Sequence, residues 1–439
     1  MSNPNISALF RQGTNRIWQS RFARNVSIVA SGTAGAQAIT IAFAPIITRL
    51  YGPEAFGLLG TFMAITAIMV PIAALTYPTA IVLPKNDQDA LGLARLSVML
   101  SIVMAALVAT ILMFSGDRAA AALGVESVAR YLLLIPVFML FAAWMQIAHQ
   151  WLIRKKEFSV VARSALAHSL IVNSAKSGIG WFHPVGAVLI VLATFGQALH
   201  AALLLIGARR RYHHRSESSR ATLRQLAHRH RDFPFYRAPQ SFINAASGSL
   251  PVLMLAAFFG PVAAGFYTLA KMVMGMPTIL IGKAVNDVFY PRITEALHKG
   301  ENLPRYILQT TAVLFAIGLI PYGIVILTGP WLFSLVFGGE WNTAGEYASW
   351  LSIWLLIAFS AQPSATAIPV LSLQKEFLVY EIVSVLLRVS AIVTGVQIFE
   401  SAVMAVALFS LSGVGLSLFL IVWVVSASYK RKTKLNHDE

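Results

Sequence analysis

The sequence predicts an all-α integral membrane protein with about twelve transmembrane helices, arranged in two lobes of six. The mean hydropathy is +0.69. Of the 439 residues 57% are hydrophobic and only 12% are charged, which is roughly half the charged share of a soluble chain. The apolar residues form runs of about 20, the length at which a helix crosses the hydrocarbon core. Because these runs lack the alternating polarity of barrel strands, and a chain in lipid must pair its backbone groups internally, we expect helices.

The apolar runs divide the chain into two halves joined by a polar segment. We expect the spans at about 26–49, 57–83, 92–115, 130–153, 159–180, 185–207, 238–258, 263–290, 306–328, 347–371, 377–398 and 402–428. The lobes then cover 26–207 and 234–428, with a basic segment at 1–25, a basic linker at 208–233 and a tail at 429–439. Residues 1–25 lack the apolar core and cleavage site of a signal peptide, so the first span is expected to stay in the mature protein.

The loops between the spans alternate in charge, and this predicts the orientation of the chain. One set is rich in Lys and Arg, including the linker, the run Arg154-Lys155-Lys156 and the tail; the other set carries mainly acids, such as Glu340 and Glu400. By the positive-inside rule the basic set is cytoplasmic. Both termini are therefore expected in the cytoplasm, as an even number of spans requires.

The composition also excludes several classes of function. The net charge of +16 is spread over these loops without interleaved aromatics, so nucleic acid is not an expected partner. The linker histidines are interpreted as part of a solvated basic segment against anionic lipid, and not as a metal site: His213, His214, His228 and His230. The chain has no cysteine, P-loop, H-E-x-x-H or G-x-S-x-G motif. We expect no cofactor, no metal and no enzymatic activity.

An internal repeat relates the two halves. YGPEAFG at 51–57 recurs as FGPVAAG at 259–265, each between the first and second spans of its half. A proline follows the motif at a similar distance in both halves, Pro84 in IVLPK and Pro291 in VFYPRI, where we expect each to end a span. The tripeptide KEF at 156–158 recurs at 375–377. Two parallel repeats predict two lobes related by an axis along the membrane normal, with a pathway between them that opens alternately to each side.

Three segments carry a resemblance to a known family: IITRLYGPEAFGLLGTF, AKMVMGMPTILIGKAVNDVFYPRITEA and FGGEWNTAGEYASWL. They resemble the polysaccharide transporter (Wzx-type) flippases of the multidrug/oligosaccharidyl-lipid/polysaccharide (MOP) exporter superfamily, over nearly all of 24–428. The resemblance implies a MATE-like fold in the bacterial inner membrane. It also implies the transfer of oligosaccharide units on undecaprenyl pyrophosphate across that membrane, for O-antigen, capsule or exopolysaccharide. A polymerase or co-polymerase is then an expected partner, and we assume a monomer.

Polar faces on three predicted spans supply candidate residues for such a pathway. An anionic pyrophosphate needs Arg or Lys, and sugar hydroxyls need amides and hydroxyls. A charge at the bilayer centre costs about 2.5–3.5 kcal/mol or more, which favours a functional role. The substrate-binding candidates, with Lys271 and Arg163 first, are Lys271, Arg163, Lys176, Asn173, Gln240, Asn244 and Arg237. Pro277, close to Lys271, is expected to kink its helix.

Each of these candidates has a structural alternative. Small and hydroxyl residues also line helix contacts in membranes. Lys271 could pair with an acid of another helix, while Arg163, Lys176 and Arg237 could extend to the bilayer surface. Glu381, Arg388 and Asp287 are candidates for ion coupling. A structural ion-pair network is the favoured reading of Glu381 and Arg388, and a helical i, i+4 pair with Lys283 that of Asp287.

Three other functions fit parts of the sequence. A multidrug or cation antiporter of the same superfamily would be expected to carry acids on its cavity helices, whereas here the intramembrane charge is mainly basic. A flippase for peptidoglycan lipid precursors resembles a longer chain with two further spans. A membrane-bound polymerase or glycosyltransferase would need a larger loop or domain outside the membrane. The sequence leaves the glycan and the coupling ion open.

Overall fold

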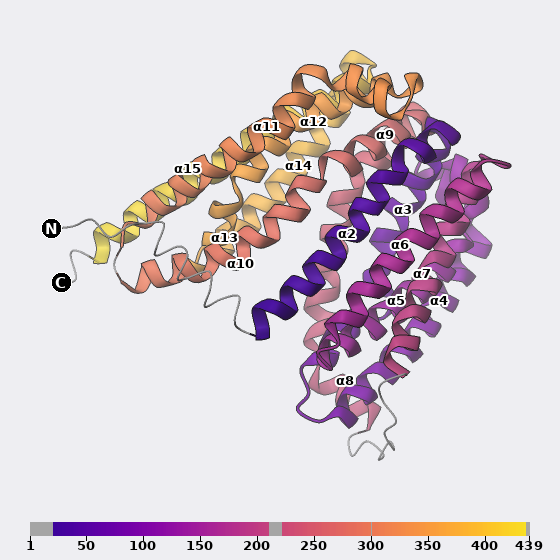
Figure 1. Ribbon diagram of the computed structural model, residues 1–439, viewed down its shortest axis with the longest axis horizontal. Coiled ribbons are helices and arrows are strands. Elements are labelled where there is room, and N and C mark those ends of the chain that lie inside the picture. The colour runs from indigo at the N-terminus through magenta and orange to yellow at the C-terminus, as the bar shows by residue number, and fades with distance from the viewer. Residues whose placement is uncertain (1–20, 210–221, 300, 436–439) are drawn as a thin grey trace. The chain divides into compact units, whose positions relative to one another are not determined.

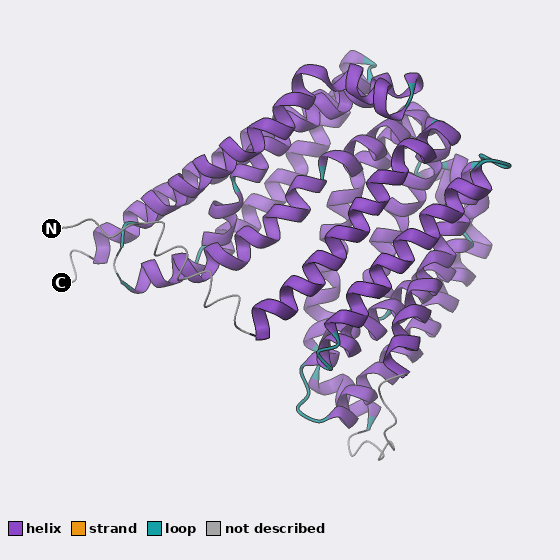
Figure 2. Cartoon of the chain, viewed as in Figure 1, coloured by secondary structure: helices purple, strands orange, loops and turns teal. Residues whose placement is uncertain are grey.

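The computed structural model describes residues 21–209, 222–299 and 301–435, without the side chains at 21–27, 209, 279–288, 298 and 430–435. Every regular element in these ranges is a helix (Figure 2). The long helices, labelled in Figure 1, are α2 (Arg21–Leu50), α3 (Pro53–Ala73), α4 (Asp87–Ala122), α5 (Leu134–Arg154), α6 (Phe158–Gly180), α7 (Gly186–Arg209), α9 (Ala238–Met274), α10 (Met276–His298), α11 (Leu303–Phe337), α12 (Asn342–Ser360), α14 (Gln374–Phe399) and α15 (Ala402–Leu435). The shorter ones are η1 (Tyr77–Val82), η2 (Glu126–Tyr131), α8 (Leu223–Arg229), η3 (Phe233–Arg237), η4 (Gly339–Trp341) and α13 (Gln362–Val370).

In the described part of the chain, ten helical segments are long and apolar enough to cross a membrane. The twelve predicted spans differ from these ten in two places. One segment, Phe233–Thr278, contains the predicted span 238–258 and the start of the next, and the chain bends inside it at Gly260, where φ is 80°. α6 matches the predicted span 159–180, but polar residues such as Arg163 and Lys176 lower its hydropathy.

The span predicted at 57–83 is interrupted. α3 ends at Ala73, Leu75 and Thr76 have positive φ, and a short 3-10 helix follows from Tyr77. Pro78 in the first turn of that helix has no N–H to donate, so the α-helical hydrogen bonds are not continued through it. Pro291 was expected to end a span. This was wrong, because α10 continues through Pro291 to His298.

The chain packs as two compact units. Unit 1 takes 1–50, 62–122 and 128–249, and unit 2 takes 51–61, 123–127 and 250–439, each over its described residues. In unit 1, α2 lies along α6, and α7 packs against α5 and α6 (Figure 1). In unit 2, α11, α12 and α15 pack together, and α14 lies beside α15. The first turns of α3 therefore belong to unit 2, although the rest of α3 belongs to unit 1.

The two copies of the repeated motif contact each other within unit 2, and the contact is reciprocal. A Cβ placed on Gly57 would lie 1.7 Å from the carbonyl oxygen of Pro261, and a Cβ on Gly265 would lie 1.9 Å from that of Pro53. In each copy the last glycine of the motif thus packs on the proline of the other copy. Only glycine allows the two backbones to approach this closely.

Aromatic side chains cover this glycine contact. Trp341 is 1% exposed, and its ring meets those of Phe56 and Phe266 edge to face, with centroids 5.0 and 6.0 Å apart. Phe56 belongs to the first motif and Phe266 directly follows the second. Such pairs add about 0.5–1.5 kcal/mol beyond the burial of their surface. Trp341 therefore joins both copies of the motif in unit 2.

The KEF repeat does not fall at equivalent positions. The turn before α6 has Lys156 at φ 58°, and the turn before α14 has Ser372 at φ 60°. In both turns the backbone N–H of the next residue donates to the carbonyl oxygen five residues earlier, Glu157 N to Leu152 O and Leu373 N to Ile368 O. The two turns are thus alike, but Ser372, and not Lys375, corresponds to Lys156. The match between the two tripeptides is offset by three residues.

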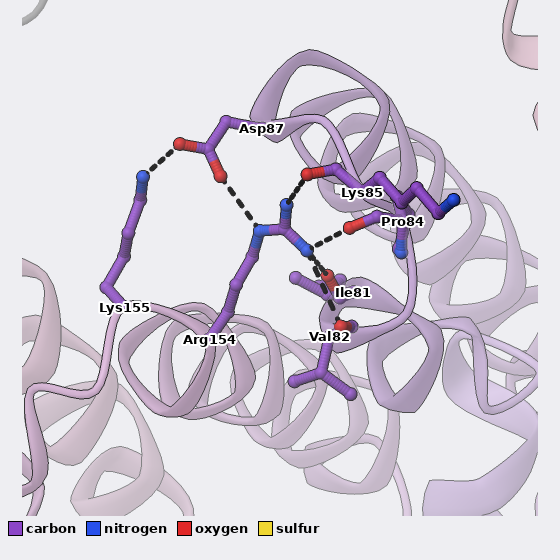
Figure 3. Close-up of polar contacts among 7 residues, drawn as sticks. All are labelled: Ile81, Val82, Pro84, Lys85, Asp87, Arg154 and Lys155. Atoms are coloured by element: carbon purple, nitrogen blue, oxygen red, sulfur yellow. Dashed lines mark hydrogen bonds and ion pairs between the residues drawn. The ribbon is translucent and has the colours of Figure 1, made fainter.

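An arginine closes the loop between η1 and α4 in unit 1 (Figure 3). Arg154 donates from Nη1 to the carbonyl oxygens of Pro84 at 2.6 Å, Ile81 at 3.3 Å and Val82 at 3.5 Å, and from Nη2 to that of Lys85 at 3.3 Å. Its Nε lies 3.0 Å from Asp87 Oδ1, and Lys155 pairs with the other oxygen of this carboxylate. IVLPK is therefore held as a turn at the end of α5.

We predict that Gly57→Ala and Gly265→Ala each destabilise the protein by about 1–3 kcal/mol, because the added methyl overlaps a backbone carbonyl that cannot move aside as a side chain would. The measurement is the unfolding temperature of the purified full-length protein in detergent. Gly178→Ala in α6 is the matched control, since nothing lies within 4 Å of the added methyl there. Equal stability of all three variants would contradict the close approach of the two motifs.

Candidate functional site

The predicted polar face of α6 divides into buried and exposed parts. Asn173 is 4% exposed, and its Nδ2 donates to Ser169 O at 2.8 Å and to Thr40 Oγ1 of α2 at 3.2 Å. Ser169 Oγ lies 2.7 Å from Ala36 O, also on α2. These groups join α2 to α6 in unit 1, so the amide of Asn173 takes part in a helix contact.

The two cations of α6 differ in their surroundings. Arg163 is exposed and lines a pocket of about 310 Å³ between α2 and α6, with Ser31 and Ser159 among its neighbours. Lys176 is half-buried near the other end of the helix. A pocket with hydroxyls and one arginine is suited to an anionic or hydroxylated group.

A third set of candidates lies on the first half of α9 and just before it, also in unit 1. Arg237 ends the π-helical turn η3, and Gln240 and Asn244 follow on α9. All three side chains are exposed. They form a polar stripe on a helix whose other residues are mostly apolar.

Lys271 lies near the end of α9 in unit 2, one turn before the helix breaks. Its side chain is exposed, and its carbonyl accepts from Gly275 N, where α9 gives way to α10. The expected kink is thus a break at Gly275, two residues before Pro277. Tyr322 OH holds the junction from α11, 3.3 Å from Met274 O and 3.2 Å from Thr278 Oγ1.

Two of the candidates for ion coupling, Glu381 and Arg388, lie on the same helix, α14. Glu381 is exposed on α14, while the guanidinium carbon of Arg388 lies 4.8 Å from the centre of the Trp354 ring of α12. Trp354 in turn meets Phe409 of α15 edge to face at 5.2 Å. Arg388 is thereby placed in an aromatic cluster that links three helices of unit 2. The Asp287 side chain lies outside the described residues.

Outside the spans, Arg292 organises the end of α10. Its Nη2 donates to Glu301 Oε2 at 2.6 Å and to Tyr306 OH at 2.5 Å. Hydrogen bonds from Arg292 and Tyr306 hold the pKa of the Glu301 carboxyl below its usual value. This carboxylate therefore stays ionised and closes the loop between α10 and α11.

Histidines inside the spans are residues that the sequence interpretation missed. The rings of His168 on α6 and His200 on α7 are stacked, with centroids 4.6 Å apart and planes inclined by 15°. Both side chains are half-buried in unit 1, as is that of His149 on α5. The sequence could have indicated these residues, because each of the predicted spans 130–153, 159–180 and 185–207 contains a histidine. An ionisable residue inside a span is a candidate functional residue, as Lys and Arg are.

Two solved structures have the same fold. A multidrug resistance MATE family transporter of the MOP superfamily, in an inward-facing conformation, matches with a TM-score of 0.68 at 14% identity, over 92% of this chain and 98% of its own. A MOP superfamily transporter from Pyrococcus furiosus matches with a TM-score of 0.59 at 14% identity, over 94% and 96% of the two chains. The fold is therefore the all-α fold of these two transporters.

Comparisons of the sequence with known proteins identify the family of the chain. The family model described as "Polysaccharide biosynthesis protein" matches residues 46–346, more than half of the chain, and the chain belongs to this family. It is 23% identical over 322 residues to the succinoglycan biosynthesis transport protein ExoT of Rhizobium meliloti (strain 1021), covering 72% of this chain. The aligned region spans 61% of the length of that relative. The chain is a multi-pass membrane protein of a polysaccharide biosynthesis family, and the bacterial inner membrane is the location that fits this family.

Proposed function

We propose that the protein is a flippase that carries undecaprenyl-pyrophosphate-linked oligosaccharide units from the inner to the outer leaflet of the bacterial inner membrane. The family and the transporter fold support transport as the activity, without a chemical reaction on the substrate. The observation that carries the finer proposal is the placement of basic, exposed side chains inside predicted membrane spans, Arg163 on α6 and Lys271 on α9.

The substrate poses a defined physical problem. Its polyprenyl chain can remain in lipid, but its diphosphate and sugars need a polar path. Arg163 in the pocket of unit 1 and Lys271 beside the α9–α10 break of unit 2 would each offer a cation to the diphosphate. The stripe Arg237, Gln240 and Asn244 would offer donors and acceptors to sugar hydroxyls. Alternating access is the mechanism expected for a repeat of this kind.

The α9–α10 break is well suited to such a cycle. Gly275 separates α9 from α10 next to Lys271, and the junction accepts hydrogen bonds from Tyr322 and from Ser352, whose Oγ lies 3.0 Å from Met274 Sδ. Pro277 has no N–H to donate to the preceding turn, so a bend there would move Lys271 at a lower cost than elsewhere in the helix.

The proposal is tested in a strain that lacks this protein and any redundant transporter. We expect an undecaprenyl-pyrophosphate oligosaccharide to accumulate on the cytoplasmic leaflet, protected from an impermeant sugar-specific probe, and to be cleared when the gene is restored. Extraction of the pool also identifies the glycan. An unchanged pool with unchanged sidedness would overturn the flippase proposal and leave an antiporter of the same superfamily as the next candidate.

We predict that Lys271→Ala and Arg163→Ala reduce transfer at least about tenfold, because each removes a charge-assisted contact to the diphosphate. Lys271→Arg should keep part of the activity. The measurement is transfer of lipid-linked glycan at matched protein levels in the membrane. Lys299→Ala is the control, since this exposed lysine lies outside the spans and pairs with Glu295. Normal transfer by both alanine variants would contradict a cationic path.

A further inference from the structure

A basic pocket lies beside the linker helix α8 in unit 1 and is not part of the proposed transport path. Its volume is about 800 Å³, and its lining includes Arg224, His228 and Arg231 together with Tyr77 and Phe235. The sequence alone indicated a solvated basic linker against anionic lipid at this point, without a defined binding site. The structure instead gives the described part of the linker a folded wall.

The walls of this pocket are anchored. Thr222 and Gln225 form a capping box that begins α8, and such a cap contributes about 1 kcal/mol. Leu226 is fully buried in a cluster with Tyr77 and Leu93. Tyr77 OH donates to Ala227 O at 3.1 Å. α8 is therefore fixed against η1 and α4, which positions the backbone that carries Arg224.

The lining of the pocket carries positive charge that ion pairs do not neutralise. Arg229 is paired with Asp89, with Nη1 and Oδ2 3.3 Å apart. Arg224 and Arg231 are exposed, and no ion pair among the described residues uses either of them. Two arginines that converge on one pocket, with His228 between them along the chain, fit the oxygens of a phosphate group.

The position of the pocket indicates where that phosphate comes from. Phe233 begins an apolar segment that is long enough to cross a membrane, so we expect Phe235 near the level where the chain enters the bilayer. Phe235 and the next residue, Tyr236, are 71% and 74% exposed. Exposed aromatic rings beside arginines are typical of the headgroup region of a membrane.

We propose that this pocket binds the phosphate headgroup of an anionic phospholipid at the membrane surface, with Arg224 and Arg231 as its ligands and Phe235 against the adjoining acyl region. The site is independent of the proposed substrate, and it would hold the linker helix on the bilayer. Two other sources share the phosphate chemistry, namely soluble diphosphate and a polyprenyl diphosphate, and the experiment separates them.

The test uses the full-length protein in lipid nanodiscs of phosphatidylcholine and measures binding of labelled phosphatidylglycerol, phosphatidylcholine, polyprenyl diphosphate and inorganic pyrophosphate. In the double variant Arg224→Gln/Arg231→Gln, affinity for phosphatidylglycerol should fall roughly tenfold, with no change for phosphatidylcholine. The matched control is Arg305→Gln/Lys375→Gln, which removes two exposed cations from unit 2, and should bind as wild type does. Phe235→Ala should weaken binding of phosphatidylglycerol and leave that of pyrophosphate unchanged.

Three results would overturn the proposal. Wild-type affinity of the double variant for phosphatidylglycerol would remove the two arginines as ligands. An equal loss in the control would show that total charge, and not this pocket, attracts the lipid. Tighter binding of pyrophosphate or polyprenyl diphosphate than of phosphatidylglycerol, lost in the double variant, would assign the pocket to another ligand. Because both arginines are exposed, we expect the double variant to fold, which the unfolding temperature checks.

Discussion

The contact between the two copies of the glycine motif is the constraint on which unit 2 depends. Gly57 packs on the Pro261 carbonyl and Gly265 on that of Pro53, and the ring of Trp341 closes over both copies. The same glycine-to-carbonyl contact is made twice, by equivalent residues of the two repeats. A larger residue at either glycine would therefore disturb the packing of both copies. The contact explains why YGPEAFG and FGPVAAG both end in glycine, and why the first turns of α3 pack apart from the rest of that helix.

The proposed functions of both units follow from polar groups that apolar helices hold at defined points. In unit 1, hydroxyls and the amide of Asn173 join α2 to α6 and leave Arg163 exposed at the edge of that contact. In unit 2, Gly275 and Tyr322 set a break beside Lys271. The arginine clamp at Arg154 and the anchored helix α8 organise the loops outside the apolar segments. The two proposals, transport and lipid binding, thus rest on different parts of the chain.

Much of the fold follows from the sequence, because apolar runs of span length permit little except helices in lipid. The position of the YGPEAFG repeat was informative since its glycines make the contact themselves. The KEF match was misleading as a guide to equivalent positions. The two turns are alike in backbone conformation, with positive φ at Lys156 in one and at Ser372 in the other, although these residues differ. The stacked pair of His168 and His200 was missed because facing side chains on α6 and α7 depend on helix rotation, which periodicity alone does not give. The roles of Arg163 and Lys271 remain predictions.

The close approach of α3 and α9 at the two motifs can be tested most directly with a disulfide placed next to it. The chain has no cysteine, and a Cβ on Gly60 would lie 3.0 Å from that of Thr268, close to the separation in a disulfide of about 3.5–4.5 Å. We would measure disulfide formation on oxidation in the full-length double variant Gly60→Cys/Thr268→Cys in proteoliposomes. We predict a cross-link in most molecules of the double variant and none in either single variant. A double variant that folds but does not cross-link would contradict the close approach of the two motifs.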